Sequence, residues 1–275
     1  MTLDIIIVSF NARADLERCL HSLHAAPAAT PHRVIVVDNA SSDGSVETVR
    51  RGWPDVTVIE LPSNAGFAAA NNAGIRAARG HLILLLNSDT IVPAGAIDRL
   101  VARLAREPEV AAAGPRLVDG EGRAEWSFGR MLTPWTEARR AIAGRLYGKR
   151  VPGVTWAVEE ATRRESYPDW VSGACLLVRR DAAERAGLLD ERYFMYEEDV
   201  DFCATLRATG GRILFTPVAE VVHLRGRSAR SAPVATRLAY HRSHAAFYAK
   251  HDPRWVPWLG MWTRLKGIKQ EERGK

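Results

Sequence analysis

The first hundred residues alternate between two hydrophobic patterns. Short, continuous apolar runs are typical of strands that are covered on both faces. Between these runs, apolar residues recur at helical spacing, as at Leu16, Cys19, Leu20 and Leu23. We predict strands at 3–8, 34–37, 56–61 and 82–86, and helices at 16–23, 43–52, 68–78 and 97–104. This order predicts an α/β fold whose central sheet is mostly parallel, with helices on both faces.

The periodicity is lost after Pro115 and returns near Trp170. Gly, Pro, Trp and Arg are scattered between 115 and about 167, which predicts a long loop region with short helices. Beyond it we predict strands at 174–178, 213–216 and 218–224, and helices at 181–186 and from 197 onward.

Composition narrows the class of protein. The chain has 275 residues, of which 47% are hydrophobic and 25% charged, values that exclude disorder, collagen and coiled coil. Its three widely spaced cysteines exclude a disulfide scaffold and a Cys-type zinc site, and favour a reducing compartment. An acid at Asp4 and a short apolar run exclude a signal peptide, and no run approaches the ~20 apolar residues of a membrane span. We therefore expect a cytoplasmic protein, at most peripheral to a membrane.

Polar clusters follow the predicted strands. Ser9 follows the first strand, Asp38 the second, Asn64 the third and Asn87 the fourth. Because ligands of such sheets bind outside the carboxyl ends of the strands, the set predicts a binding crevice, although each cluster alone is also compatible with an ordinary polar turn. Asp38 is suited to accept hydrogen bonds from a base or ribose.

The fourth cluster has the chemistry of a cation site. In LLLNSDT, Asn87 and Asp89 are two residues apart and point to the same side of the chain. Hard divalent cations such as Mg²⁺ and Mn²⁺ take oxygen ligands and bridge to phosphates. Asn-Ser-Asp is also common turn chemistry, so the motif alone leaves both interpretations open.

A segment rich in small residues follows the third strand. In NAGFAAANNAG, a helix that begins near Gly66, just before Phe67, would present free N–H groups to a phosphate, and Asn64 and Asn71 offer amides. Small residues would equally serve tight helix packing.

Two further motifs carry titratable groups. Glu197, Glu198 and Asp199 are consecutive carboxylates; like charges raise at least one pKa, which suits a general base, whereas the alternative is an acidic first turn of a helix. His223 follows an apolar strand and is either a metal ligand or, as we prefer from this motif alone, a surface histidine.

Together these residues resemble the inverting family 2 glycosyltransferases of GT-A fold, particularly the rhamnosyltransferase-like branch of bacteria. The resemblance rests on motifs that occur in the family's order over about residues 1–230: IIIVSFN, VDNASSDGS, NAGFAAANN, LLLNSDT, PRLVDGEG, VSGACLLVRR, FMYEEDVDFCATLRATG and VVHLRGRS.

The resemblance implies a role for each position. Asp199, in the Glu198–Asp199 pair, would be the catalytic base, while Asp89 and His223 would hold Mg²⁺ or Mn²⁺. Asn87 stands where the family's DxD motif has its first Asp, which leaves the site one charge short. The implied donor-binding residues are Ser9, Asp38, Asn64, Gly66, Phe67, Asn71 and Asn87, and the implied acceptor side comprises Trp170, Gly173 and Ala174.

The implied activity is metal-dependent hexosyl transfer from a nucleotide-diphosphate sugar, first of all dTDP-rhamnose, to a hydroxyl of a cell-surface glycan or a lipid-linked precursor. A sugar-nucleotide nucleotidyltransferase is an alternative, but SFNARADL lacks the Gly-rich basic loop that it would need. The second alternative is a non-catalytic sugar-nucleotide-binding protein of the same fold.

The C-terminal segment lies beyond these motifs. We place a catalytic domain at 1–230 and a basic, aromatic helical extension at 231–275. Aromatic residues mixed with Lys and Arg suit a membrane interface, and packing on the catalytic domain or a dimer contact are the alternatives. The net charge of +6 also admits nucleic acid, but no recognised binding module accompanies it, so we expect no nucleic-acid partner.

Overall fold

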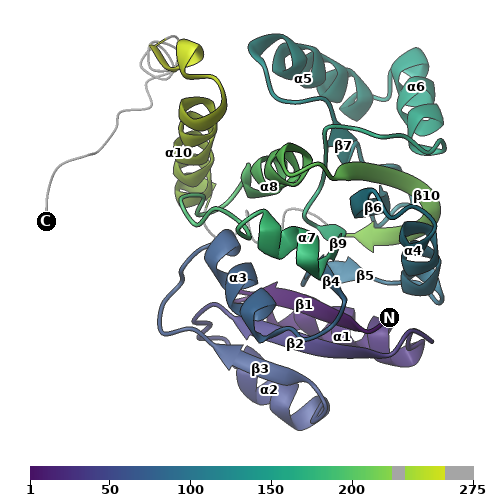
Figure 1. Cartoon of the computed structure of the whole chain (residues 1–275), viewed down its shortest axis with the longest axis vertical. Helices are drawn as coiled ribbons and strands as arrows, with labels where there is room; N and C mark the ends of the chain where they lie inside the picture. Colours follow the sequence, from purple (N-terminus) through teal and green to yellow (C-terminus); the bar gives the residue numbers. More distant parts are fainter. Residues whose placement is uncertain (225–232, 258–275) are drawn as a thin grey trace, which may run out of the picture.

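An eight-stranded sheet forms the centre of the molecule (Figure 1). The computed structural model describes residues 1–224 and 233–257. The strand order is β3-β2-β1-β4-β9-β6-β10-β5, in which the first four strands are parallel and β9 runs antiparallel to both of its neighbours. These strands are β1 (Leu3–Ser9), β2 (His32–Asp38), β3 (Thr57–Glu60), β4 (Leu82–Asn87), β5 (Thr90–Ile91), β6 (Val110–Val118), β9 (Cys175–Arg179) and β10 (Arg212–His223).

Helices cover both faces of this sheet. Alternate residues of β1 belong to different cores, because Ile5 and Ile7 face one side and Ile6 and Val8 the other. The covering helices are α1 (Arg13–Ala25), α2 (Ser45–Gly52), α3 (Phe67–Ala77), α4 (Ala96–Ala105), α7 (Arg180–Arg185) and α8 (Glu198–Ala208). The predicted α/β class and helices on both faces are confirmed.

Close packing of α3 on the sheet explains its small residues. A Cβ atom on Gly74 would lie 2.5 Å from Cγ2 of Ile6. The helix therefore approaches β1 more closely than a side chain at this position would allow. Tight packing, one of the two interpretations of this segment, holds for its C-terminal half.

The sequence patterns missed three features. The strand β6 was not predicted, because its Ala-Ala-Ala-Gly-Pro stretch has weak strand propensity. Two predicted strands are one, β10, whose pairing with β6 shifts register between Thr216 and Glu220. The region 115–167 holds two regular helices, α5 (Pro134–Gly148) and α6 (Pro152–Thr162), as well as β7 (Phe128–Gly129), which pairs with β8 (Trp170–Val171).

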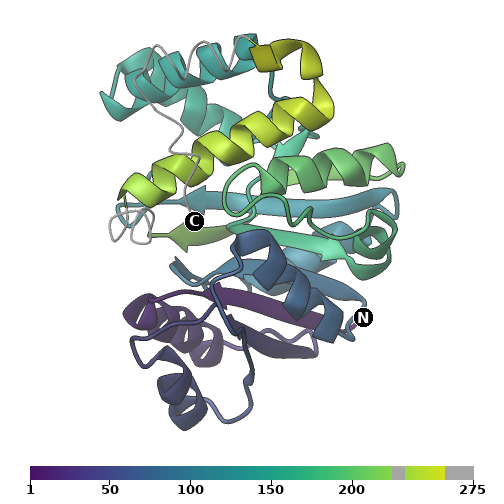
Figure 2. The same cartoon turned by 90° about the vertical axis from the view of Figure 1, so that its left-hand side faces the viewer.

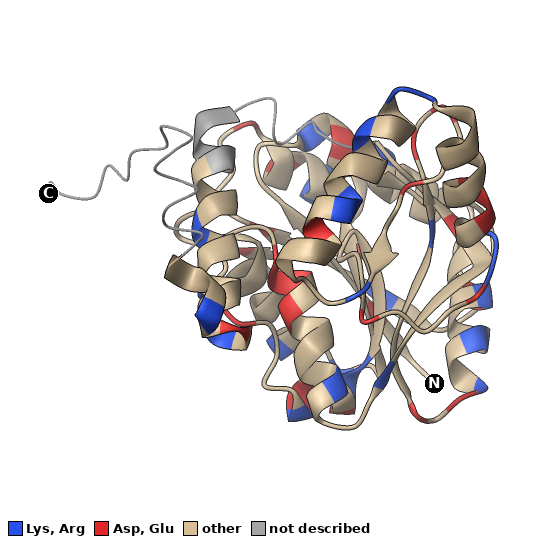
Figure 3. Ribbon diagram, turned by 90° about the horizontal axis from the view of Figure 1, so that it is seen from above, with Lys and Arg blue, Asp and Glu red and all other residues tan. Residues whose placement is uncertain are grey.

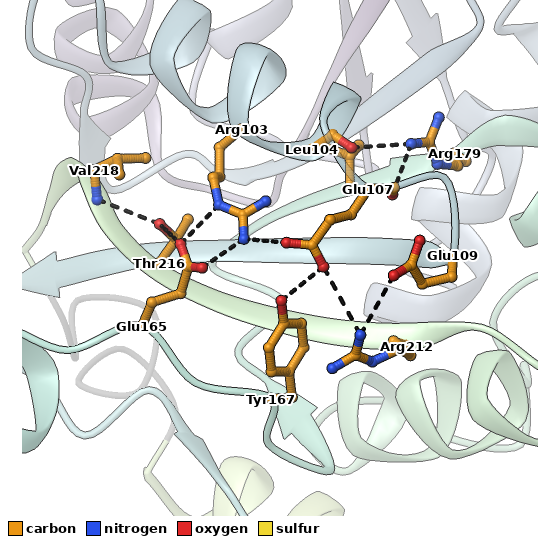
Figure 4. A network of polar contacts seen from close by, with 10 residues as sticks. All are labelled: Arg103, Leu104, Glu107, Glu109, Glu165, Tyr167, Arg179, Arg212, Thr216 and Val218. Atoms are coloured by element: carbon orange, nitrogen blue, oxygen red, sulfur yellow. Dashed lines mark hydrogen bonds and ion pairs between the residues drawn. The ribbon is translucent and has the colours of Figure 1, made fainter.

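A polar network ties α4 to the far part of the sheet (Figure 4). The guanidinium of Arg103 on α4 donates to Glu165 at 2.8 Å and pairs with Glu107. Thr216 of β10 donates to the same Glu165 at 2.9 Å, and Tyr167 donates to Glu107 at 2.6 Å. Because Arg103 is largely buried, this network fixes the chain just before β8 against α4 and β10.

The helix α10 (Pro233–His251) packs on the α/β part of the chain, next to the α5–α6 region (Figure 2). Phe247 and Tyr248 are each 1% exposed. Lys250 donates to Asp201 at 2.8 Å, and Ser243 donates to the carbonyl of Met195 at 2.7 Å. For α10, packing on the domain is therefore the alternative that holds.

The predicted extension continues beyond α10. The short helix η1 (Pro253–Trp255) follows α10, whereas Trp258, Trp262 and the basic residues after them lie outside the described residues. Within the described ranges, no helix is both long and apolar enough to cross a bilayer. Seen from above, Lys and Arg are spread over many elements among Asp and Glu (Figure 3).

We predict that α10 unfolds together with the sheet. Phe247→Ala removes a fully buried aromatic ring and should lower the free energy of unfolding by about 3–5 kcal/mol. Leu238→Ala, on an exposed position of the same helix, should change it by no more than about 0.5 kcal/mol. Chemical denaturation measures both values. Equal stability of the two variants would contradict the assignment of α10 to the cooperative unit.

Candidate active site

Strand register brings three predicted donor residues to one edge of the sheet. Ser9 pairs with Asp38 across β1 and β2, and Val8 pairs with Asn87 across β1 and β4. The carboxyl ends of these parallel strands therefore carry Ser9 beside Asp38, and Asn87 ends β4 one position earlier, opposite Val8. Asp38 is 3% exposed, and one of its carboxylate oxygens, Oδ2, accepts the N–H of Ser41 at 2.8 Å.

Four buried polar atoms of the predicted site residues have no partner. Ser9 Oγ, Asp38 Oδ1 and Asn87 Oδ1 belong to this edge and Glu198 Oε2 belongs to α8, and none of the four makes a hydrogen bond within the described part of the chain. A buried polar atom without a partner costs about 1–3 kcal/mol, so folded proteins keep few of them. Four of them on residues predicted to bind or act on one ligand mark a polar binding site.

His223 lies against Asp89, the residue with which the family resemblance groups it. The antiparallel pairing of β10 with β5 sets His223 opposite Thr90, and the N–H of Leu224 donates to the carbonyl of Asp89 at 2.8 Å. The two ring nitrogens of His223 lie 3.3 Å from Asp89 Oδ1 and 3.1 Å from Glu125 Oε2. His223 is thus a nearly buried site residue, and the surface position preferred from its motif alone is wrong.

Electrostatics of this group favour a cation. Burial by itself lowers the pKa of His223, but the hydrogen bonds to Asp89 and Glu125 raise the pKa to about 9. The positive charge of the ring is therefore stabilised by two carboxylates. Asn87 completes the group, since its Nδ2 lies 3.5 Å from Nε2 of His223 and its Oδ1 has no partner among the described residues. Carboxylate and amide oxygens are ligands for Mg²⁺ or Mn²⁺, and an ion bound here would take the place of the proton on the His223 ring.

The segment before α3 is tied to two other parts of the site. Asn39, at the end of β2, donates to Asn64 Oδ1 at 2.9 Å and accepts the N–H of Ala65 at 2.8 Å. The N–H of Phe67 donates to the carbonyl of Phe194 at 2.6 Å. A Cβ on Gly66, which has a φ of +88°, would lie 2.5 Å from that same carbonyl oxygen. The predicted helix start at Gly66 is therefore held against the loop that precedes Asp199.

Asn71 has a local partner. Its amide donates to the carbonyl of Phe67 at 2.9 Å, and the side chain is 1% exposed. Its neighbour Asn72 exchanges two hydrogen bonds with Leu189 of the facing loop. These contacts use the two amides to fix α3 and its surroundings.

The acidic motif forms the start of α8, and its carboxylates are desolvated. Burial raises the pKa of Glu197 to about 7. Burial also raises the pKa of Glu198 well above its usual range, and the charge of Asp199 raises it further. Burial raises the pKa of Asp199 too, although hydrogen bonds from the N–H groups of Gly173 and Val200 oppose this rise. The backbone is left-handed at both Tyr196 and Glu197, with φ of 71° and 67°, which turns the chain sharply before the helix.

The predicted acceptor-side residues connect the two halves of the site. Gly173 donates its N–H to Asp199 Oδ2 at 2.8 Å, and Ala174 accepts the N–H of Asn87 at 2.9 Å. Trp170 is 4% exposed, and the guanidinium of Arg140 lies 4.3 Å above its ring. Trp170 thus contributes to this side by supporting Arg140, while Gly173 and Ala174 hold Asp199 and Asn87 in place.

A third polar group includes Glu197, the first residue of the acidic motif. Carboxylates of Glu137 and Glu197 and the ring of His244 place ligand atoms within 4.8 Å of one another. His244 Nε2 lies 2.5 Å from one oxygen of Glu137, and the hydroxyl of Tyr248 donates to the other at 3.0 Å. These residues could hold a metal ion, but Glu137 already has two partners from α10, so the contacts seen here fasten α10 to α5.

Sequence analysis missed Glu125, Asn39, Glu137 and His244 as parts of the site. Glu125 and Glu137 fall in the region where no periodicity was visible, and their partners are more than 90 residues away in the chain. Asn39 is adjacent to Asp38, so only its contact with Asn64 distinguishes it from a turn residue. Neither composition nor residue spacing in a single sequence reveals such long-range pairs.

Comparison with solved structures supports the fold. The mannosyltransferase PcManGT from Pyrobaculum calidifontis, in complex with GDP-Man and Mn²⁺, is similar with a TM-score of 0.61 and 20% identity over 94% of this chain and 68% of that one. The S. aureus protein TarS 1–349 in complex with UDP-GlcNAc is similar with a TM-score of 0.59 and 17% identity over 92% and 68%. Both share the curled central sheet flanked by helices that is expected of GT-A glycosyltransferases.

Sequence relatives give the family. The chain is 31% identical, over 96% of its length and 89% of the relative, to the N-acetylglucosaminyl-diphospho-decaprenol L-rhamnosyltransferase of Mycobacterium tuberculosis. It is 30% identical, over 93% of its length and 19% of the relative, to the O-antigen biosynthesis protein RfbC of Myxococcus xanthus. Residues 4–168 match the sequence model of glycosyl transferase family 2. The chain is a glycosyltransferase and belongs to glycosyl transferase family 2.

Proposed function

We propose that this enzyme is a metal-dependent, inverting glycosyltransferase that moves rhamnose from dTDP-rhamnose to a hydroxyl of a lipid-linked glycan precursor. The observation that carries the proposal is the set of buried, unpartnered polar atoms on Ser9, Asp38, Asn87 and Glu198 within the described ranges. The choice of sugar and acceptor is supported by the similarity to a rhamnosyltransferase whose name specifies a diphospho-decaprenol acceptor.

Donor binding would use the ends of β1, β2 and β4. Asp38 is suited to accept hydrogen bonds from the nucleoside, because one of its oxygens has no partner in the described chain. The N–H groups of Gly66 and Phe67, expected to be free for a phosphate, are bonded to Asn64 and to the carbonyl of Phe194. The N-terminus of α3 would therefore contribute its partial positive charge rather than these two donors. Asp89, His223 and Asn87 would hold Mg²⁺ or Mn²⁺, which supplies charge neutralisation of the leaving diphosphate when bound.

The reaction itself needs one base and one displacement. Asp199 accepts the proton of the acceptor hydroxyl, whose oxygen forms a bond to the anomeric carbon while the bond from that carbon to the diphosphate oxygen breaks. The nucleoside diphosphate leaves with the bonding electrons, and the configuration inverts. The two backbone N–H groups of Gly173 and Val200 hold the Asp199 carboxylate in a fixed orientation. Burial of this helix start raises the pKa of Asp199 above its usual range.

The two alternatives predict different chemistry. A sugar-nucleotide nucleotidyltransferase would bind a nucleoside triphosphate, and a non-catalytic binding protein would bind a sugar nucleotide without turnover. The pairing of Asp89 with His223 and the desolvated Asp199 favour an enzyme with a metal and a base.

Membrane association would suit a lipid-linked acceptor. We propose that the enzyme works in the cytoplasm at the inner face of the membrane, with the C-terminal segment as one candidate for the contact. Since α10 uses Phe247 and Tyr248 for packing, that role would fall on residues after 257.

A sugar-nucleotide panel tests the proposed donor. We expect dTDP-rhamnose with Mn²⁺ or Mg²⁺ to raise the melting temperature, because a ligand that binds only the folded state stabilises it. Asp89→Asn should abolish the metal-dependent part of the shift, whereas Asp181→Asn, on α7, should leave it unchanged. Thermal-shift measurements with and without a chelator report both effects. No response to any sugar nucleotide would contradict the proposal.

Replacement of the proposed base tests the mechanism. Asp199→Asn keeps the shape of the side chain but cannot accept the proton, so kcat should fall about 10²-fold or more. Donor affinity, measured by the same thermal shift, should stay within about twofold. Asp190→Asn serves as the matched control, because this carboxylate lies in the preceding loop and pairs with Lys250. Near-normal turnover by Asp199→Asn would remove Asp199 from the role of base.

The pH dependence follows from the raised pKa of Asp199. The base works when ionised, so kcat/KM should fall as the pH drops through its pKa, and this acid limb should lie above about 3.9, the pKa of an ordinary aspartate. Burial keeps Glu197 and Glu198 protonated in this pH range, whereas the positive charge of Arg140 lowers the pKa of Asp199. Arg140→Gln removes that positive charge, so it should move the acid limb to higher pH in rate profiles measured with a soluble acceptor. A shift to lower pH would contradict this electrostatic coupling.

A further inference from the structure

The helix α5 carries its polar side chains inward and its large apolar ones outward. None of its residues is buried. Glu137 bonds to His244, and Tyr147 donates to the carbonyl of Ala124 at 2.8 Å, so these side chains face the domain. Trp135, Ile142 and Leu146 are 77%, 58% and 36% exposed. An ordinary surface helix has the opposite arrangement, so the outer face of α5 lacks the partner that its apolar side chains would have in a core.

Basic side chains share this outer face. Positions 135, 139, 142, 146 and 149 are separated by four, three, four and three residues, which places them on one side of the helix. Arg139 and Lys149 therefore stand between and beyond the apolar residues, and Arg145 lies next to them. None of the three forms an ion pair within the described part of the chain. The outer face thus combines exposed apolar groups with unneutralised positive charge.

The acidic groups of the same region are engaged elsewhere. Residues 133–164 contain seven Lys or Arg and three Glu. Glu137 contacts His244, Glu159 pairs with Arg116 at 2.8 Å, and Glu160 pairs with Arg164 at 2.5 Å. No carboxylate of this region therefore remains to neutralise the outer face of α5, which makes that face complementary to an anionic surface.

The neighbouring helix α6 extends the apolar surface. It packs against α5, and Figure 1 shows the pair projecting at the end of the molecule opposite α2 and β3. Trp156 on α6 is 69% exposed, and Val151 between the helices is 36% exposed. A cavity of about 380 Å³ lies between the two helices, lined by Trp126 and six small or aliphatic residues: Ala143, Gly153, Val154, Ala157, Val158 and Ala161. Exposed Trp, aliphatic and basic residues together are typical of helices that lie in a bilayer interface.

The inner side of the same helix reaches the catalytic site. Arg140 lies 4.3 Å above the ring of Trp170, three residues before Gly173, which bonds to Asp199. The cavity residue Trp126 directly follows Glu125, the partner of His223. A surface bound to the outer face of α5 would therefore lie on the acceptor side of the enzyme.

We propose that the α5–α6 pair is a membrane-docking surface for an anionic bilayer, which brings the head group of a lipid-linked acceptor to Asp199. The apolar side chains of Trp135, Ile142 and Leu146 enter the interface, and Arg139, Arg145 and Lys149 contact the anionic lipid head groups. This inference deepens the proposed function, since it rests on a lipid-linked acceptor, but vesicle binding can be measured without any catalysis.

Vesicle flotation of the full chain tests the proposal. We expect binding to phosphatidylglycerol/phosphatidylethanolamine vesicles and at least about tenfold weaker binding to phosphatidylcholine vesicles. The triple variant Arg139→Glu/Arg145→Glu/Lys149→Glu should bind the anionic vesicles at least about tenfold more weakly, as should Trp135→Ser/Ile142→Ser/Leu146→Ser. Turnover of a water-soluble acceptor should stay unchanged in both variants, which separates docking from catalysis.

Matched controls define the outcomes that would overturn the proposal. Arg51→Glu/Arg79→Glu/Arg106→Glu makes the same charge change on exposed arginines of other elements and should retain vesicle binding. Trp258→Ser/Trp262→Ser tests the C-terminal segment in the full chain. Loss of binding in this last variant alone would overturn docking through α5–α6. The α5–α6 variants could instead float normally but change the protein from a dimer to a monomer. That result would assign the surface to a contact with a second copy of the chain. If the full chain does not bind vesicles but turns over a soluble acceptor normally, the docking proposal is wrong and the proposed function is unaffected.

Discussion

The register of three parallel strands is the constraint on which the site depends. Because β1 pairs with β2 and β4 without a slip, Ser9, Asp38 and Asn87 end at one edge of the sheet. A shift of one residue would turn each of these side chains to the opposite face. The apolar residues of β1 that precede Ser9 are buried on both faces and therefore fix this register. The core thus sets the position of the polar groups, and their unpartnered atoms are the cost that a bound ligand would remove.

Contacts between residues far apart in the sequence add the remaining groups to the site. β10 lies beside β5 and places His223 against Asp89, while α10 contacts Asp201 on α8 and Met195 in the loop before α8. At the end of that loop, Tyr196 and Glu197 have left-handed backbone, a costly conformation that surrounding contacts must maintain. The C-terminal helix is therefore part of the support for Asp199, although it lies beyond the family motifs. The predicted boundary at residue 230 marks the end of the family motifs, but α10, which lies beyond it, packs on residues that precede it.

Sequence alone predicts the elements whose hydrophobic pattern reflects the core. The strands at 3–8, 34–37 and 82–86 were found because they are buried on both faces, and α1 and α4 because each buries one apolar stripe. β6 was missed because alanine and glycine give little signal. The family resemblance pointed to Asp89 and His223, although their local motifs left the first open and favoured a surface position for the second. Glu125 could not be predicted, because its contact with His223 spans 98 residues and leaves no local pattern.

The helix α5 is longer and more regular than the short helices predicted for this region, for a different physical reason. A hydrophobic pattern reveals a helix whose apolar face turns toward its own core, whereas α5 bonds to the domain through Glu137 and Tyr147. Its N-terminal end is nevertheless well specified, since Thr133 and Thr136 form a capping box and Pro134 begins the helix. A well-capped helix with its apolar side outward is stable only if its polar contacts suffice or its outer face finds an apolar medium. The weak hydrophobic pattern of α5 and the exposed Trp135 on its outer face are therefore two results of the same arrangement, in which the polar side of the helix faces the domain.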